Sequence, residues 1–325
     1  MTGITIGDPN GVGPEILLRT YCEKKMTQDI FAIGDYEVIQ FCNRKLTLEV
    51  PVYRMNSPVD YRKGFLNVLD MRIIDKNEIT IGQVSRKGGL ASLKYIEKAT
   101  ELALDGLISS MVTLPIHKEA VRLIRSDFRG HTDFIAGLCG VKKYTMMLVA
   151  DSLIVTHISM HVSMKEALER IKSRHILDVI RLTNQTVGKL QSQTRLAVAG
   201  LNPHAGEHGA FGDEEIREIE PAVKLARAEG IEVEGPIPPD TVFYQAVNGK
   251  YDAVVCMYHD QGHIPLKLLA FDTAVNVTLG LPIIRTSVDH GTAFDIAYKG
   301  SASIHSFVNA LNLADRLVRS NINKK

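Results

Sequence analysis

The chain has 325 residues, of which 45% are hydrophobic and 23% are charged, with 38 basic and 37 acidic side chains. This composition is typical of a globular protein that is long enough to form more than one domain. The formal net charge of +1 provides no overall field to hold a nucleic-acid backbone or an anionic membrane surface. We therefore expect neither nucleic acid nor membrane as a partner, and any anionic ligand must be bound by a local pocket.

The four cysteines stand apart in the sequence and form no Cys-x-x-Cys pair. This spacing argues against a disulfide framework or a zinc knuckle, and it favours a reducing, cytoplasmic environment. The first residues lack the basic and apolar segments of a signal peptide, and no apolar run approaches the roughly 18 residues that a spanning helix needs. We expect a cytoplasmic protein.

Short apolar runs alternate with segments of helical spacing, which indicates an α/β fold with a mostly parallel sheet. A strand at 4–6 leads into Gly7-Asp-Pro-Asn-Gly-Val-Gly-Pro-Glu15, which is either a tight turn with Pro14 at the start of a helix or a loop whose amides face a ligand. Helices are predicted at 85–104 and 213–229, the second with acidic residues at its start and Gly230 after its end. The other strands are predicted at 30–34, 107–113, 145–150, 153–155, 196–200 and 253–258.

The most informative histidines follow predicted strands and lie in polar loops. His161 follows the run at 153–155, His204 lies in Asn-Pro-His-Ala-Gly after the run at 196–199, and His259 follows the run at 253–256. Three neutral imidazoles that converge from separate strands form an open site for a divalent metal ion. The alternative for each is a structural histidine, and His157 competes with His161 for the same position.

Basic and polar residues near other strand ends indicate an acidic substrate. Lys267 and Arg285 offer a point charge and a planar fork that suit phosphate or carboxylate. His131 and Thr132 stand where a helix begins, which is another favourable place for an anion. Surface ion pairing is the alternative for each of these residues. Asp289 opens a further predicted helix, and it either caps that helix or binds a ribose.

No strand leads into Gly-x-Gly-x-x-Gly, and no phosphate-binding Gly-x-x-x-x-Gly-Lys-Ser/Thr sequence is present. Several ordered motifs nevertheless resemble the 4-hydroxythreonine-4-phosphate dehydrogenase family over essentially the whole chain. These motifs are Gly7 to Glu15, Gly130-His-Thr-Asp-Phe134, Leu201-Asn-Pro-His-Ala-Gly-Glu207, Gly235-Pro-Ile-Pro-Pro-Asp-Thr241, Met257-Tyr-His-Asp-Gln-Gly262 and Gly280-Leu-Pro-Ile-Ile-Arg-Thr-Ser-Val-Asp-His-Gly-Thr-Ala293.

The resemblance implies two α/β/α domains around a central cleft, as in the isocitrate and isopropylmalate dehydrogenases. It implies a first domain of 1–127 plus 291–325, and a second domain of 128–290 that carries the metal ligands and the dimer contacts. It also implies a homodimer with shared active sites, and NAD chemistry without a Rossmann fingerprint.

Site residues are carried over by motif. The resemblance implies one divalent ion (zinc, cobalt, manganese or magnesium) held by His161, His204 and His259, with these ligands shared between subunits. The substrate residues are His131, Thr132, Lys267, Asn276 and Arg285. The residues for NAD or NADP are Leu279, Gly280, Ser287, Asp289, His290, Gly291 and Thr292. The candidates for the general base are Asp240, Asp260 and Lys118.

The implied reaction oxidises and decarboxylates 4-phosphohydroxy-L-threonine to 3-amino-2-oxopropyl phosphate, in pyridoxal phosphate biosynthesis. Two departures stand out. The family usually has Thr-His-Leu/Ile-Pro-Leu where this chain has Met160-His-Val-Ser-Met164, and many members that act in the vitamin pathway have an apolar residue in place of His263. The second departure resembles a branch that oxidises D-threonate or D-erythronate 4-phosphate. From other classes, a metallohydrolase acting on a phosphorylated substrate and a non-catalytic phosphate binder are the alternatives.

Overall fold

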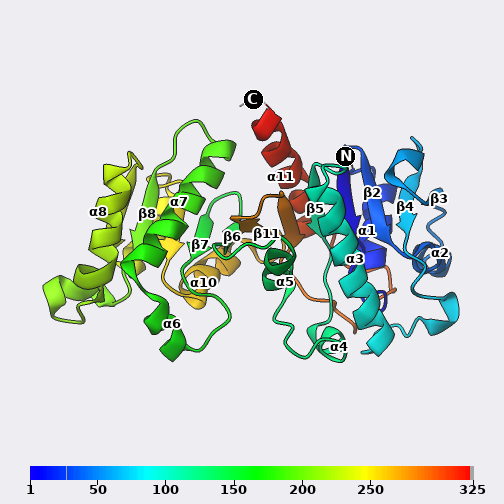
Figure 1. The fold of residues 1–325 in the computed structure, drawn as a ribbon, viewed down its shortest axis with the longest axis horizontal. Coiled ribbons are helices and arrows are strands. Elements are labelled where there is room, and N and C mark those ends of the chain that lie inside the picture. Colours follow the sequence, from blue (N-terminus) through cyan, green and yellow to red (C-terminus); the bar gives the residue numbers. More distant parts are fainter. Residues whose placement is uncertain (27, 323–325) are drawn as a thin grey trace. The chain divides into compact units, whose positions relative to one another are not determined.

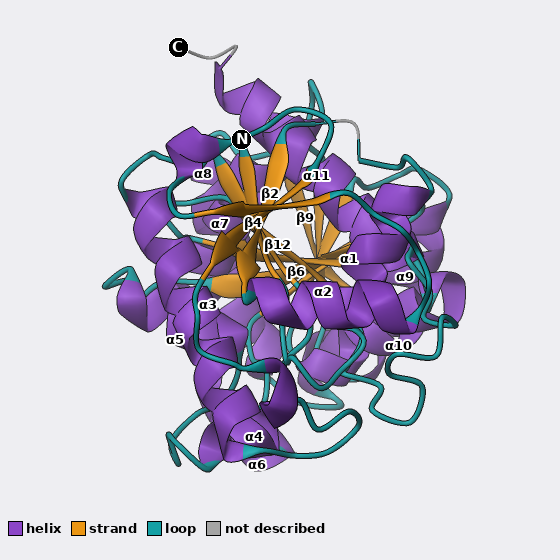
Figure 2. Ribbon diagram, turned by 90° about the vertical axis from the view of Figure 1, so that its right-hand side faces the viewer, coloured by secondary structure: helices purple, strands orange, loops and turns teal. Residues whose placement is uncertain are grey.

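The computed structural model describes residues 1–26 and 28–322, and it confirms the predicted α/β class. Contacts divide the chain into two compact units. The first comprises Met1–Lys142 and Leu281–Arg319, and the second comprises Lys143–Gly280 and the residues from Ser320. Within the units the strands lie inside and the helices lie outside (Figures 1 and 2).

The first unit is built on parallel strands in the order β3-β4-β2-β1-β5-β12. Four of them (β1, β2, β5 and β12) are buried along their whole length, and of these β2 is a continuous run of apolar and small residues. The bounds are β1 Thr2–Thr5, β2 Ile30–Gly34, β3 Val52–Met55, β4 Leu66–Asp70, β5 Ser110–Thr113 and β12 Arg285–Val288.

Two long helices of the first unit begin where the sequence predicts a helix start. Pro14 lies in the first turn of α1, and the side chain of Ser85 caps α3 by accepting a hydrogen bond from the amide of Gly88. The helices are α1 Gly13–Cys22, α2 Tyr36–Lys45, α3 Arg86–Leu104, α4 Lys118–Arg122, α5 His131–Leu138 and α11 His305–Ile322, with short turns η1 Pro58–Asp60 and η2 Lys76–Glu78.

The second unit has strands in the order β11-β6-β7-β10-β8-β9. The β7, β10, β8 and β9 strands run parallel, whereas β6 is antiparallel to both of its neighbours, β11 and β7. The bounds are β6 Thr145–Val149, β7 Ile154–His157, β8 Leu196–Ala199, β9 Val233–Ile237, β10 Ala253–Cys256 and β11 Val275–Leu279. The core of this unit includes the fully buried Val155, Val254 and Leu266.

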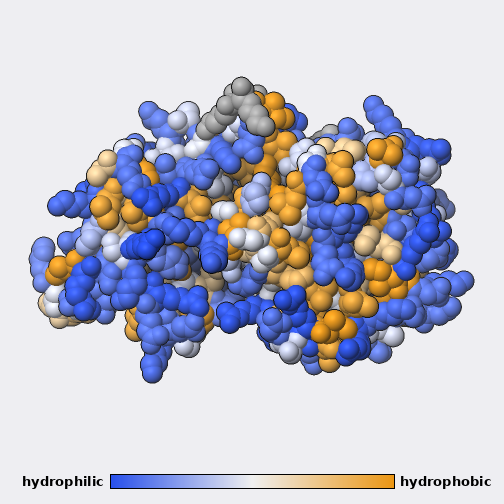
Figure 3. Space-filling view, in the orientation of Figure 1, coloured by the Kyte–Doolittle hydropathy of each residue, from blue (hydrophilic) through white to orange (hydrophobic). Residues whose placement is uncertain are grey.

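The helices of the second unit are α6 Met164–Arg170, α7 Ser173–Leu190, α8 Glu220–Ala228, α9 Pro239–Val247 and α10 His259–Ala270. Two irregular turns, η3 Pro203–Gly209 and η4 Glu215–Ile219, precede α8, so the helix predicted at 213–229 divides into a π-turn and an α-helix. Among the described residues no helix combines the length and the apolar character needed to cross a bilayer. Polar and charged side chains cover most of the face drawn in Figure 3.

The prediction that a helix begins at Asp289 is wrong. The described residues after Asp289 form turns, and the next helix, α11, begins at His305. Ala293 and Tyr298 have positive φ angles of 41° and 59°, which interrupt a right-handed helical path. The hydroxyl of Tyr298 donates to the carbonyl of Pro9, so this segment is held by the Gly7–Glu15 loop rather than by helical hydrogen bonds.

The two units divide the chain at positions that differ from the expected domain boundaries of 127/128 and 290/291. Residues 128–142 belong to the first unit by contact, because α5 packs on α3. Residues 281–290 also belong to it, because β12 pairs with β5 through Arg285 opposite Met111.

Candidate active site

Two of the predicted metal ligands line the same pocket of the second unit. The β7 and β10 strands are parallel neighbours with His157 opposite Cys256, so the loops that follow them leave the same edge of the sheet. His161 lies in the first of these loops, and His259 begins α10 after the second. Both line a cavity of about 370 Å³, and their ring centroids are 5.5 Å apart.

Asp260 fixes the orientation of the His259 ring. Its Oδ1 atom lies 2.6 Å from Nδ1 of His259, and Asp260 lines the same cavity. A neutral imidazole that donates from Nδ1 to a carboxylate presents the lone pair of Nε2, which is the usual arrangement behind a metal-bound histidine. The structure thus places Asp260, a candidate general base, as the hydrogen-bond partner of His259.

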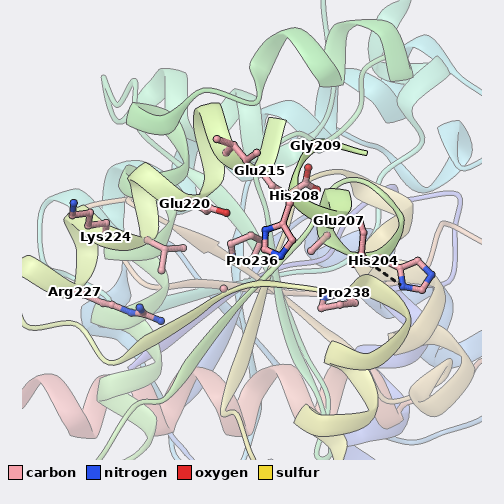
Figure 4. Close-up of a pocket in the computed structure, with 14 residues that line it drawn as sticks. His204, Glu207, His208, Gly209, Glu215, Glu220, Lys224, Arg227, Pro236 and Pro238 are labelled. Atoms are coloured by element: carbon pink, nitrogen blue, oxygen red, sulfur yellow. Dashed lines mark ion pairs between the residues drawn. The ribbon is translucent and has the colours of Figure 1, made fainter. Parts of the chain in front are cut away.

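His204 lies in a different cavity of the second unit. Its side chain is 66% exposed, and its Nδ1 is 3.9 Å from Oε2 of Glu207. The cavity has a volume of about 570 Å³, and His208 also lines it (Figure 4). Within the described part of one chain, no three His, Cys, Asp or Glu side chains are grouped so that they could hold a metal ion.

Gln261 connects the loops that carry His259 and His204. Its side-chain Oε1 accepts a hydrogen bond from the amide of Met257, and its Nε2 donates to the carbonyl of Gly200 at 2.7 Å. The amide side chain is almost fully buried, so these bonds are shielded from water. The two loops are therefore held as one piece although their histidines line separate cavities.

The turn that carries His204 is left-handed. The φ angles of His204, Ala205, Glu207 and His208 lie between 41° and 53°, where each L-residue other than glycine costs roughly 1–2 kcal/mol. The buried carboxylate of Glu215 compensates: its Oε1 accepts from the amides of Leu201 and Asn202, and its Oε2 accepts from Nδ2 of Asn202. Glu215 therefore holds the start of this turn.

We predict that Glu215→Ala lowers the free energy of unfolding by about 2–4 kcal/mol, because it removes a buried charged acceptor and leaves several donors unsatisfied. Urea unfolding of the full chain measures this loss. Glu220→Ala is the matched control, because Glu220 is exposed and lines the same cavity. A loss as small as that of the control would contradict the role assigned to Glu215.

A basic group lies in the first unit at the start of α5. The Nε2 atom of His131 is buried and has no hydrogen-bond partner among the described residues. Arg285 is 2% exposed and donates from Nη2 to Oγ1 of Thr113 at 2.7 Å. Lys118 approaches the same place, since a Cβ atom at Gly130 would lie 3.9 Å from its Nζ. Thr132 stands in the first turn of the same helix.

Burial and the neighbouring positive charges set the protonation states of His131 and Arg285. Desolvation lowers the pKa of His131 well below its usual value, and the positive charges of Arg285 and Lys118 add to this effect. Burial lowers the pKa of Arg285 to about 9, so the guanidinium stays charged at neutral pH. A neutral donor and two cations favour a bound phosphate or carboxylate.

The other expected substrate residues lie in the second unit. Lys267 is on α10 with its Nζ 5.4 Å from the ring centroid of Phe271. Asn276 is on β11, where its Nδ2 contacts Sδ of Met146 at 2.8 Å. Its Oδ1 is buried without a hydrogen-bond partner among the described residues, which makes it an acceptor for a ligand.

The expected cofactor residues form two segments. Leu279 ends β11 and Gly280 follows it, with a φ of 88° at a place where a Cβ would lie 2.3 Å from the carbonyl oxygen of Lys143. Only glycine fits there. The second segment, Ser287 to Thr292, begins in the last part of β12 and continues beyond it through Asp289, His290 and Gly291, of which the last two are exposed.

The Gly7–Glu15 loop packs against the second cofactor segment. The amide of Val12 donates to the carbonyl of Thr292 at 3.0 Å, and the amide of Asp289 donates to Oγ of Ser306. Sequence reasoning passed over Asp8 in this loop. Its carboxyl group is fully buried, and burial raises its pKa to about 6. The Gly7–Glu15 motif, which contains Asp8, is the sequence feature that could have indicated this residue.

The remaining candidate bases belong to different units. Asp240 is an exposed residue in the first turn of α9, where its Oδ1 accepts from Oγ1 of Thr241. Lys118 begins α4 in the first unit. Sequence reasoning gave His157 only as an alternative to His161 and His263 only as a departure from the family pattern, and the structure packs both beside His259.

Comparisons with known proteins agree with one another. A sequence model described as "Pyridoxal phosphate biosynthetic protein PdxA" matches residues 26–314. D-threonate 4-phosphate dehydrogenase of Salmonella typhimurium is 41% identical over 97% of this chain and 98% of its own length. 4-Hydroxythreonine-4-phosphate dehydrogenase of Desulforapulum autotrophicum is 41% identical over 96% and 94%, respectively. The crystal structure of 4-hydroxythreonine-4-phosphate dehydrogenase from Klebsiella pneumoniae matches 98% of this chain and 99% of its own, at 40% identity and a TM-score of 0.85.

Proposed function

The chain belongs to the family of pyridoxal phosphate biosynthetic protein PdxA, and we propose that it oxidises and decarboxylates a 4-phosphorylated four-carbon acid. The named relatives are dehydrogenases, so the metallohydrolase alternative is wrong and a nicotinamide cofactor is implied. The observation that carries the proposal is the His161 and His259 pair, which lines one pocket with Asp260 bonded to Nδ1 of His259.

The donor set suits a divalent metal ion of the borderline class. Nε2 of His259 is available to a metal because Nδ1 is engaged by Asp260, and His161 faces the same cavity. We infer that His204 completes the set and that zinc, cobalt, manganese or magnesium occupies it. When bound, such an ion lowers the pKa of a substrate hydroxyl and stabilises negative charge on the resulting carbonyl.

Arg285, His131 and Thr132 are proposed to bind the anionic groups of the substrate, with Lys267 and Asn276. The buried guanidinium of Arg285 supports this role, because a bound anion compensates a charge that is removed from water. A bound nicotinamide cofactor would accept a hydride from the alcohol carbon, while a base of the protein would take the hydroxyl proton. The ketone lies beta to the carboxylate, so carbon dioxide leaves next.

Lys118 and Asp240 are the other candidate bases. The side chain of Lys118 lies near Gly130, at the start of the helix that carries His131, and it would accept a proton only as the neutral amine. Asp260 is less suited, because its carboxylate is occupied by His259 at 2.6 Å. The segments Leu279–Gly280 and Ser287–Thr292 are proposed to bind NAD or NADP.

A homodimer with shared sites is proposed, and the surface of α10 supports it. Ile264, Leu268, Leu269 and Phe271 are all more than half exposed on or just after the helix that begins with His259. A cluster of large apolar side chains at the surface is typical of a protein interface. Contact through α10 would bring a second chain close to the His161 and His259 pocket, where its His204 could complete the metal site.

Two substrates fit this chemistry. 4-Phosphohydroxy-L-threonine is the substrate expected from the sequence, and D-threonate 4-phosphate is favoured by His263 at a position where many vitamin-pathway members are apolar. The second substrate carries a hydroxyl in place of the amine at carbon 2. The relatives named for each activity are equally similar to this chain, at 41% identity.

The test offers both substrates at equal concentration with NAD or NADP and an added divalent metal, and follows the absorbance of the reduced nicotinamide. A higher kcat/KM for the amino substrate assigns pyridoxal phosphate biosynthesis. The opposite preference assigns sugar-acid catabolism. If neither substrate reduces the cofactor at any of the four metals, the proposed reaction is contradicted.

A further inference from the structure

Two histidines outside the proposed metal set pack directly against His259. His263 lies one turn later on α10, and its ring stacks on that of His259 with centroids 3.6 Å apart and an interplanar angle of 13°. His157, at the end of β7, is fully buried, and its ring centroid is 4.7 Å from that of His263. These rings support the face of His259 that is turned toward the protein interior.

The hydrogen bonds assign the protons of these two rings. Nδ1 of His157 lies 3.4 Å from the carbonyl oxygen of Met146, and Nδ1 of His263 lies 3.0 Å from the carbonyl oxygen of His259. A carbonyl oxygen only accepts, so each Nδ1 carries the hydrogen. Nε2 of His157, 3.2 Å from Nδ1 of His263, is then the acceptor of that bond. His157 therefore carries its one ring hydrogen on Nδ1, and the hydrogen bonds run in one direction, from α10 through β7 to β6.

The close approach of these rings depends on Gly262. A Cβ atom at this position would lie 2.7 Å from Nε2 of His157 and 2.9 Å from Sγ of Cys256. Only glycine at position 262 leaves room for the His157 ring to pack against α10 and contact His263. The arrangement is thus built into three elements, β6, β7 and α10, rather than into the surface of one helix.

We propose that His263 is a positioning residue that holds the ring of His259 in the orientation required to bind the metal ion. This inference rests on the proposed function, which makes His259 a metal ligand. Asp260 fixes the edge of the His259 ring, and the stacked ring of His263 fixes its face. His263 is itself anchored by His157 and by the main chain, so the supporting surface cannot rotate.

Metal binding without turnover tests the proposal. We would strip the full-length protein of metal and titrate it with Co²⁺, following the visible absorption bands. His263→Leu removes both the ring and the donor, and it is expected to weaken Co²⁺ binding about 10- to 100-fold. His263→Phe restores a flat ring against His259 and should recover part of that loss. Unchanged Co²⁺ affinity and bands in His263→Leu would overturn the proposal.

Three further variants separate the possible causes. His305→Leu removes an exposed histidine of α11 that lies outside the proposed site. It controls for Co²⁺ bound nonspecifically by surface imidazoles, and it should bind Co²⁺ as tightly as wild type does. In a His259→Ala background, His263→Leu should have no additional effect, because the ring it orients is gone. A further loss of Co²⁺ affinity in the double variant would show that His263 does not act through the ring of His259. A His263→Phe variant that binds Co²⁺ as weakly as His263→Leu would show that stacking is not the cause.

The failure of the proposed function has a different signature. If His259→Ala itself binds Co²⁺ as tightly as wild type, then His259 is not a ligand and the metal set is wrong. If His259→Ala loses the metal and His263→Leu does not, the metal set stands and the inference about His263 alone fails. Circular dichroism of each metal-free variant shows whether it is folded, and His263→Phe, which keeps the volume of the ring, serves if the Leu variant does not fold.

Discussion

His204→Ala is expected to lower kcat/KM by at least about 10³-fold while the free energy of unfolding stays within about 0.5 kcal/mol of wild type. The side chain is 66% exposed, its ring centroid lies 6.0 Å from that of Phe211, and its Nδ1 lies 3.9 Å from Oε2 of Glu207. Removing it therefore costs little packing. The large loss of activity is expected because a metal site that keeps two of three imidazoles binds its ion poorly.

His208→Ala is the matched control for this prediction. It removes an imidazole from the same left-handed turn and the same cavity, and the proposed reaction gives it no role (Figure 4). Steady-state kinetics, at a metal concentration just sufficient for wild type, and urea unfolding are measured on both variants. Turnover by His204→Ala equal to that of His208→Ala would contradict the assignment of His204 to the metal site.

The position of His161 beside His259 follows from features that a sequence reveals. Each residue comes just after a short apolar run, and the carboxyl ends of parallel strands meet at one edge of a sheet. The observed pairing of β7 with β10 satisfies that condition, so a shared pocket results. Likewise, Ser85 and Pro14 marked helix starts by chemistry that acts within a few residues, and the structure confirms both starts.

Interactions between distant segments could not be predicted in this way. The bond between Gln261 and Gly200 joins residues 61 positions apart, and that between His263 and His157 joins residues 106 positions apart. Neither leaves a local pattern in the sequence. The left-handed turn at His204 was hidden for a related reason, because it is stabilised by the buried carboxylate of Glu215 and not by the preferences of its own residues.

The helix expected after Asp289 shows the opposite error. Asp is one of the residues preferred at a helix N-cap, so Asp289 at the start of Asp-His-Gly-Thr-Ala293 favours a helix start by local chemistry. Here the segment is instead held by Tyr298 against Pro9 and by Val12 against Thr292, which are contacts with the other end of the chain. Tertiary bonds to the Gly7–Glu15 loop thus overrode a weak local preference.

Mixing two inactive variants is expected to restore activity if the metal ligands come from two subunits. His204→Ala and His259→Ala should each be inactive alone, since each dimer of either variant lacks one ligand at both sites. After dissociation and random reassociation, half of the dimers are mixed, and each mixed dimer has one site that carries neither substitution and one that carries both. Turnover should then rise from near zero to about a quarter of wild type.

The distribution of the histidines in one chain motivates this experiment. His161 and His259 share a cavity, whereas His204 lines another, and no metal-binding group of three is found within the described residues. His204→Ala mixed with His161→Ala extends the test to the third ligand. A control mixes His204→Ala with tagged wild type. The amount of His204→Ala that is recovered with the tag measures the fraction of exchanged subunits. If exchange is complete and the two inactive variants remain inactive together, all three ligands act within one subunit and the shared site is contradicted.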